Sequence, residues 1–314
     1  MFKRIYKEYL GQWLSWISSV LTIVLCSAMI VYVFVNGISH ISPQFLLTDP
    51  YPGSPGSDEA SMGGILSPII GTLLLTVIGI TIAFPWALST AIYLSEYSER
   101  NPLAKYFRLG IDVLSSVPTV VIGIFGLTVF CLPQLGFMSS MVEGVENVSR
   151  AFGRSFLVAG ITMAVMVLPF IIKTCEESIK AVPQFYREGS LAMGASRWHT
   201  IVKIIIPSAK NGIITAVVLG MGRIIGDTAI VWLALGGSIR MTGMQPWWSP
   251  QNWISTLRNT GSTLTSYIFF TSPAGELNMP GLAFGASFIL IIIIVALNLF
   301  ADLLGNLNKT IREE

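Results

Sequence analysis

Apolar residues are gathered into six long runs, which more polar segments separate from one another. A helix needs about 20 mostly apolar residues to cross the hydrocarbon core of a bilayer, and each run approaches or exceeds that length. The predicted spans are Trp16–Val35, Ile65–Leu94, Leu109–Gln134, Phe156–Ile172, Gly212–Gly236 and Leu282–Leu307. The pattern predicts an all-α membrane protein with six transmembrane helices.

Composition excludes the soluble alternative. The 314 residues are 53% hydrophobic and only 11% charged, with a mean hydropathy of +0.69, whereas a soluble domain averages about 25% charged residues. A net charge of +2 is too small to indicate nucleic-acid binding. Membrane lipid is therefore the expected surrounding, and no nucleic-acid partner is expected.

The first run has the basic flank of a signal peptide, with Lys3, Arg4 and Lys7 before it. It is longer than the roughly 7–15 apolar residues of a usual signal core. The nearest approach to a small-residue cleavage site, Gly37–Ser39, is poor. We therefore predict a retained helix, with a cleaved signal peptide as the alternative.

Basic residues alternate between the loops. Of the nineteen Lys and Arg residues, fourteen fall in the N-terminal segment, loops two and four and the C-terminal tail, and four fall in loops three and five. Loops rich in Lys and Arg stay in the cytoplasm. The distribution predicts a multi-pass protein of the plasma (inner) membrane with both termini cytoplasmic.

A turn-rich segment, Tyr51–Ser57, lies between the first and second spans and contains two Pro-Gly pairs. We place a boundary after it, near Met62. Residues 1–62 would be an N-terminal transmembrane helix with an extracytoplasmic linker, and residues 63–314 a transmembrane unit of five helices.

The fourth loop, Lys173–Asn211, has helical character. Residues 184–193 favour one helix, which Gly194 can end. A second helix is predicted from Arg197 to Ile206, with Ser196 as its N-cap and Pro207 halting it. Two helices too short to span a membrane indicate a docking element or, alternatively, a lid over helix ends.

Two charged residues, Arg223 and Asp227, lie within the fifth predicted span. An arginine in a span costs roughly 2.5–3.5 kcal/mol on insertion scales. Their spacing of four would place both on one helix face. Either they form a structural ion pair, or the guanidinium binds an anion in a translocation path. Guanidinium can donate two parallel hydrogen bonds to phosphate oxygens.

Other polar clusters have simpler explanations. Trp247, Trp248 and Trp253 are expected to anchor the chain at the membrane interface, or alternatively to contact a binding protein. Glu176 and Glu177 are expected to form a solvated face.

Enzyme and cofactor motifs are absent from the sequence. It contains no G-x-x-x-x-G-K-[ST], no H-E-x-x-H and no G-x-S-x-G. The cysteines are far apart and the two histidines lie in different loops, so no metal site is predicted. We expect no cofactor and no catalytic activity, and any ATP-driven process would need another chain to hydrolyse the ATP.

The fourth loop resembles the "EAA" loop of importer-type ABC-transporter permeases, in which E-A-A is followed after three residues by G and after nine more by I-x-L-P. The stretch at about 183–207 has this spacing over twenty residues. The matching residues are Glu188, Gly194, Ile204 and Pro207, and the departures are Gly189, Ser190 and Ile206.

Further stretches resemble phosphate-specific (Pst) permeases. They are Gly63–Leu74, Ile92–Tyr97, Val117–Gly123, Leu168–Glu177 and Arg223–Ala229. Tyr93, Tyr97 and Thr228-Ala229 favour the A subunit over the C subunit. Asp227 stands where the family usually has Glu, and Arg240–Thr265 is hard to match.

The resemblance implies a permease subunit of an ATP-driven phosphate importer, forming half of the translocation path. Its partners would be a C-type permease subunit, two ATP-binding subunits and an extracytoplasmic phosphate-binding protein. Arg223 and Asp227 would line the path. The residues implied in ATPase coupling are Glu188, Ser190, Ala192, Gly194 and Pro207. The alternatives are a sulfate or molybdate permease, or an ion-coupled carrier or channel.

Overall fold

The computed structural model describes residues 2–50, 63–98, 101–143, 149–244, 246 and 249–310. The long helices are α1 (Phe2–Ile38), α3 (Leu66–Ile92), α6 (Phe156–Lys180), α9 (Ile206–Gly226) and α12 (Pro280–Thr310). The shorter helices are α2 (Pro43–Leu47), α4 (Pro102–Ser116), α5 (Thr119–Phe130), α7 (Gln184–Ala192), α8 (Arg197–Thr200), α10 (Trp253–Arg258) and α11 (Leu264–Thr271). Strands β1 (Met141–Glu143) and β2 (Ser149–Ala151) form an antiparallel hairpin.

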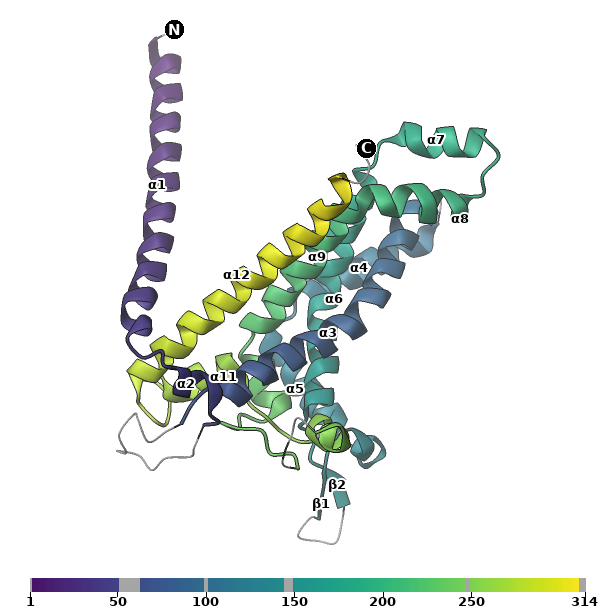
Figure 1. Cartoon of the computed structure of the whole chain (residues 1–314). Helices are drawn as coiled ribbons and strands as arrows, with labels where there is room; N and C mark the ends of the chain where they lie inside the picture. Colours follow the sequence, from purple (N-terminus) through teal and green to yellow (C-terminus); the bar gives the residue numbers. More distant parts are fainter. Residues whose placement is uncertain are drawn as a thin grey trace.

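The chain is a helical membrane protein, as predicted. Among the described residues, five helical segments are long and apolar enough to cross a membrane, and a bent pair supplies a sixth span if it counts as one. The five are Gly11–Ile38, Leu66–Tyr97, Phe156–Lys180, Arg197–Gly226 and Pro280–Phe300. The beginning of α1 and the end of α12 lie at the same end of the molecule as α7 and α8, as an even number of spans requires (Figure 1).

Helix α6 is the centre of the core. It packs along α3 and α9 and also touches α5, and Phe156, Met163 and Ile171 on it are fully buried. The approach to α3 is close because Gly160 lacks a side chain: a Cβ there would collide with Ile78. Small residues at such crossings allow the backbones of membrane helices to approach.

Helix α1 stands apart from this core (Figure 1). Its apolar side chains are exposed along the span, and it meets the rest of the chain near its C-terminal end, against α12. Two edge-to-face aromatic pairs make that contact, Tyr32 with Phe284 at 5.5 Å and Phe34 with Phe288 at 5.1 Å between ring centroids. The remaining apolar surface of α1 suits a lipid environment.

The third span is not the single helix that was predicted over Leu109–Gln134. Helices α4 and α5 meet at an angle of 99°. Val117 and Pro118 are extended between them, with ψ angles of 128° and 139°. Proline restricts the residue before it to extended conformations and cannot donate a helical hydrogen bond, which explains the break.

The fifth span also differs from the prediction of Gly212–Gly236. Helix α9 ends at Gly226, and Asp227 is extended with ψ 124°. A π-helical turn, η5 (Val231–Leu235), follows and ends at Gly236, where φ is +107°. Glycine readily adopts this left-handed conformation.

The short helix predicted from Arg197 to Ile206 does not stop at Pro207. It continues from α8 through a π-helical turn, η4 (Ile201–Ile205), into α9. In that turn the Ile206 N–H bonds the carbonyl of Ile201, five residues earlier. The wider turn shifts the hydrogen-bond register just before the proline, so the helix passes it without breaking.

Several predicted features lie outside the described residues. They are the linker Tyr51–Ser57 with the boundary after residue 62, and the side chains of Trp247 and Trp248. The division into residues 1–62 and 63–314 stays a prediction. Trp253, the first residue of α10, is exposed.

Candidate functional site

Helices α7 and α8 form a hairpin that projects from one end of the bundle (Figure 1). Gly194 lies in the connection with φ +83°, a left-handed conformation that glycine adopts without strain. The Ser196 hydroxyl then accepts a hydrogen bond from the His199 N–H at 3.2 Å and caps α8. The predicted Gly194 turn and Ser196 cap are both present.

The residues implied in ATPase coupling take different positions on this hairpin. Glu188, Ala192 and Gly194 are exposed. Ser190 is buried, and its hydroxyl hydrogen-bonds that of Thr200 at 2.8 Å, which joins α7 to α8. Pro207 is half-buried at the beginning of α9. The exposed set could contact another protein, whereas Ser190 holds the hairpin together.

A partly buried ion pair lies between α7 and the segment that follows α3. The Arg187 guanidinium donates to both carboxylate oxygens of Glu96, through Nη2 at 2.9 Å and Nε at 3.2 and 3.3 Å. Glu96 belongs to η2 (Tyr93–Tyr97), a π-helical turn that continues α3. Neither residue was predicted to have a role. Because they are 91 positions apart, no sequence spacing indicates the pair.

A second ionic cluster lies on the neighbouring helices. Glu176 of α6 pairs with Arg108 of α4 at 2.7 Å and with Lys180 at 2.6 Å. The predicted solvated face is therefore wrong for Glu176, which is buried, and right for the exposed Glu177. Burial of a carboxylate is tolerated here because two cations neutralise it.

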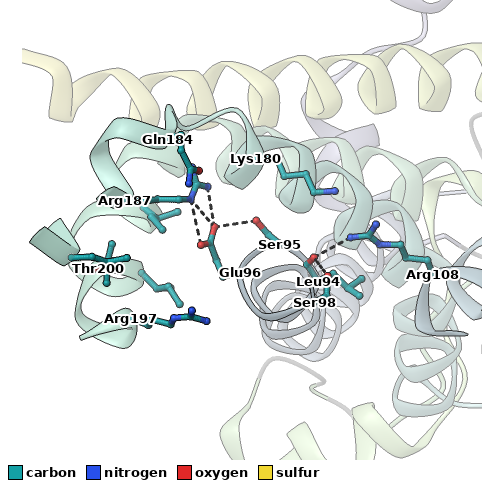
Figure 2. Close-up of a pocket in the computed structure, with 13 residues that line it drawn as sticks. Leu94, Ser95, Glu96, Ser98, Arg108, Lys180, Gln184, Arg187, Arg197 and Thr200 are labelled. Carbon is teal, nitrogen blue, oxygen red and sulfur yellow. Dashed lines mark hydrogen bonds and ion pairs between the residues drawn. The ribbon is translucent and has the colours of Figure 1, made fainter. Parts of the chain in front are cut away.

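A pocket of about 480 Å³ lies between α7 and the ends of α3 and α6 (Figure 2). Four basic side chains line it: Arg108, Lys180, Arg187 and Arg197. Figure 2 shows Arg187 extending toward Glu96 while Arg108 reaches the Leu94 carbonyl, a hydrogen bond of 3.0 Å. On the side of α7 that faces this pocket, the ion pair of Arg187 with Glu96 connects the helix to the bundle.

Arg223 lies in the last turn of α9 and not near the middle of a span, because the helix ends at Gly226. Its side chain is exposed in this chain, and the guanidinium carbon is 5.7 Å from the centre of the Phe170 ring. No described carboxylate lies within 4.0 Å of the guanidinium. A cation at a helix C-terminus is favoured by the helix dipole, but it still requires water or a partner within the membrane.

Asp227 does not share a helix face with Arg223, since it follows the end of α9. Its carboxylate accepts a hydrogen bond from the Ile230 N–H at 2.8 Å. This contact, three residues along the chain, is that of a helix N-cap. The predicted four-residue pairing on one face therefore fails. The sequence signal that identifies Asp227 as a cap is Gly-Asp followed by an apolar run.

The two helix breaks lie close together. Helix α5, which begins just after Pro118, packs against η5, and a Cβ on Gly123 would lie 3.5 Å from the Cα of Ile230. The Thr265 hydroxyl donates to the Asp227 carbonyl at 3.5 Å. Interrupted helices within a membrane present backbone and hydroxyl groups that can contact a polar substrate.

Comparison with known proteins decides the family. Residues 79–309 match the model of the binding-protein-dependent transport system inner membrane component. The chain belongs to this family. It is therefore a multi-pass inner-membrane permease and a non-catalytic subunit of an ABC importer, which operates with ATPase and binding-protein partners.

Individual relatives agree with this assignment. The chain is 30% identical over 294 residues to the probable ABC transporter permease protein YqgI of Bacillus subtilis, covering 90% of this chain and 92% of that one. It is 32% identical to the phosphate transport system permease protein PstA of Mycobacterium leprae, with 77% and 70% covered. It is 29% identical to PstC of Haemophilus influenzae, with 57% and 59% covered.

Solved structures share the fold. A bacterial alginate ABC transporter, crystallised with a periplasmic protein that binds an alginate pentasaccharide, has a chain that aligns with a TM-score of 0.61 over 96% of this chain and 95% of that one, at 16% identity. The MetNI methionine ABC transporter in an inward-facing conformation aligns with a TM-score of 0.57 over 77% and 94%, at 15% identity. The predicted importer-permease architecture is confirmed.

Proposed function

We propose that this permease carries inorganic phosphate, as the A-type subunit of an importer. It would pair with a C-type permease subunit, associate with two ATP-binding subunits and receive phosphate from an extracytoplasmic binding protein. Relatives named as phosphate permeases, both PstA and PstC, support the substrate. The stretches of the sequence that resemble phosphate permeases agree with these relatives.

The exposed Arg223 is the observation on which the substrate proposal rests. A guanidinium at the end of an apolar helix, with no carboxylate within 4.0 Å among the described residues, is available to a polar group outside this chain. A translocation path between two permease subunits would supply water and, transiently, phosphate. The bidentate fork of arginine matches the phosphate oxygens. Asp227, on the other side of the helix break, would limit how tightly an anion is held.

The α7–α8 hairpin would dock on an ATP-binding subunit. The exposed Glu188 and Ala192 would form the contact, and Gly194 would allow the turn. Ser190 and Pro207 would support it from within. Closure of the ATPase subunits around ATP would then displace the hairpin and switch the access of the path.

The decisive experiment replaces the cation. Arg223→Gln should reduce uptake of radiolabelled phosphate to background while the complex still assembles, since both the charge and the fork are lost. Arg223→Lys should retain part of the uptake because the charge remains. Uptake must be normalised to assembled complex.

A double variant separates a phosphate contact from a structural role. Asparagine is a good N-cap, so Asp227→Asn removes the charge and keeps the cap at Ile230. If Arg223 meets phosphate, Arg223→Gln with Asp227→Asn stays inactive. Uptake near that of wild type in the double variant would refute the phosphate contact.

Competition identifies the oxyanion. Excess unlabelled phosphate should abolish uptake, while sulfate or molybdate should not. Uptake that continues without the ATP-binding subunits and follows an ion gradient would instead identify an ion-coupled carrier and contradict the proposal.

A further inference from the structure

Helix α7 has few ties to the transmembrane bundle. It packs mainly against α8 and η4, and the pocket separates it from α3. In the described part of the chain, the polar contacts between α7 and η2, the π-helical turn that continues α3, are those of Arg187 with Glu96. A displacement of α7 that is transmitted to the α3 segment by direct polar contacts is therefore transmitted by this pair.

The guanidinium of Arg187 also holds the end of α6. It donates through Nη2 to the Ile179 carbonyl at 2.9 Å and through Nη1 to the Val182 carbonyl. One planar group therefore joins three elements, namely α7, the C-terminal end of α6 and the π-helical turn η2. Figure 2 shows the contact with Glu96. The planar, five-donor fork of arginine permits this, whereas lysine would lose the geometry.

Burial makes this pair different from the surface pairs nearby. The side chains of Arg187 and Glu96 are only 15% and 12% exposed, and the Ser95 hydroxyl also donates to Glu96 at 3.1 Å. By comparison, Lys173 and Asp112 form a 2.7 Å pair whose side chains are 43% and 62% exposed. Exposed pairs contribute little, whereas removal of one partner from a buried pair leaves an uncompensated charge.

The other end of α3 reaches the helix breaks. Thr72, in the second turn of α3, accepts a hydrogen bond from the N–H of Leu264, the first residue of α11, at 2.9 Å. The adjacent Thr265 donates to the Asp227 carbonyl. A continuous set of contacts therefore runs from the α7–α8 hairpin, along α3, to the segment where α9 is interrupted.

We infer that the Arg187–Glu96 pair is a positioning contact that transmits displacement of α7 to α3 and so couples the ATPase to the translocation path. This inference rests on the proposed docking role of the α7–α8 hairpin. It predicts that breaking the pair separates ATP hydrolysis from transport without separating the subunits.

The test uses the complete transporter, with its ATP-binding subunits and binding protein, in proteoliposomes. Glu96→Gln should leave the subunits co-purifying and ATP hydrolysis measurable. Phosphate transported per ATP hydrolysed should fall by about fivefold or more, the lower end of typical coupling effects. Asp112→Asn, which breaks the exposed pair with Lys173, is the matched control and should leave this ratio unchanged.

Two further variants show whether the pair acts as a unit. Arg187→Lys should retain only part of the wild-type ratio of transport to hydrolysis, because the charge remains and the fork is lost. Glu96→Gln combined with Arg187→Gln should be no worse than either single variant, since both remove the same contact. A merely structural role would instead lower assembly and transport together and leave the ratio of transport to hydrolysis unchanged.

The outcomes separate this inference from the proposed docking. A wild-type ratio in Glu96→Gln, or loss of assembly in that variant, overturns the positioning role. If the proposed docking role of the α7–α8 hairpin is wrong, the result is different: variants with Glu188 or Gly194 replaced will bind the ATPase and transport normally. A substrate other than phosphate is recognised in the same vesicles by measuring uptake of labelled sulfate or molybdate in the wild type.

Discussion

The substitution Gly194→Ala tests the turn of the α7–α8 hairpin directly. Gly194 has φ +83°, and no atom lies within 4 Å of the place where its Cβ would be. Space is therefore not the obstacle, and the cost of the substitution comes from the backbone conformation. For a residue with a side chain, the left-handed conformation costs about 1–2 kcal/mol.

The chain offers a matched control five positions earlier. Gly189 lies within α7 and also has no atom within 4 Å of its Cβ position, but its φ is that of a helix. Alanine there should stabilise the helix by about 0.5–1 kcal/mol. The same chemical change is thus expected to have opposite effects at the two glycines.

The backbone strain of alanine at position 194 exists only while the turn keeps its native shape. It therefore weakens docking if the bound hairpin must keep that shape and the free hairpin need not. If the undocked hairpin relaxes, a cost of about 1–2 kcal/mol lowers the affinity for the ATP-binding subunit by about 5- to 30-fold. The assay is a titration of the purified permease pair with the ATP-binding subunit, which measures Kd for wild type, Gly194→Ala and Gly189→Ala. Gly189→Ala should bind like wild type or more tightly.

Equal affinities for the two alanine variants would refute this reasoning. Wild-type binding by both would mean that the Gly194 turn is not part of the docking surface. Equal weakening of both would mean that Cβ atoms clash with the partner and that backbone strain is not the cause.

Three further predictions concern topology and stability. A cysteine replacing the exposed Ala192, with the three native cysteines removed, should react with an impermeant maleimide only after the cells are permeabilised; reaction in intact cells would contradict the orientation. Gly160→Val should lower the melting temperature of the complex, because a side chain there collides with Ile78 and such overpacking costs about 1–3 kcal/mol; an unchanged melting temperature would show that the contact with α3 relaxes. Asp227→Ala should destabilise the chain by about 0.5–2 kcal/mol through loss of the N-cap at Ile230, and Asp227→Asn should not; equal unfolding midpoints for the two would exclude the cap.

Features that depend on residues close together in the chain could be predicted from the sequence. The apolar runs identified α3, α6 and α12, because crossing a bilayer requires a continuous stretch of hydrophobic residues. Gly194 and Ser196 identified the turn and cap of the hairpin for the same local reason. Hydropathy alone could not show that α4 and α5 form two helices, because the break changes direction without interrupting the apolar run.

The arrangement of charges depended on contacts between distant segments. The burial of Glu176 and the pairing of Glu96 with Arg187 follow from how α3, α4, α6 and α7 are brought together. A carboxylate that would be solvated on an isolated helix becomes buried when another helix brings a guanidinium to it. The amino-acid sequence therefore determined which segments enter the membrane, and the tertiary structure decided which charges meet, since the energy of an ion pair depends on distance and burial and not on position along the chain.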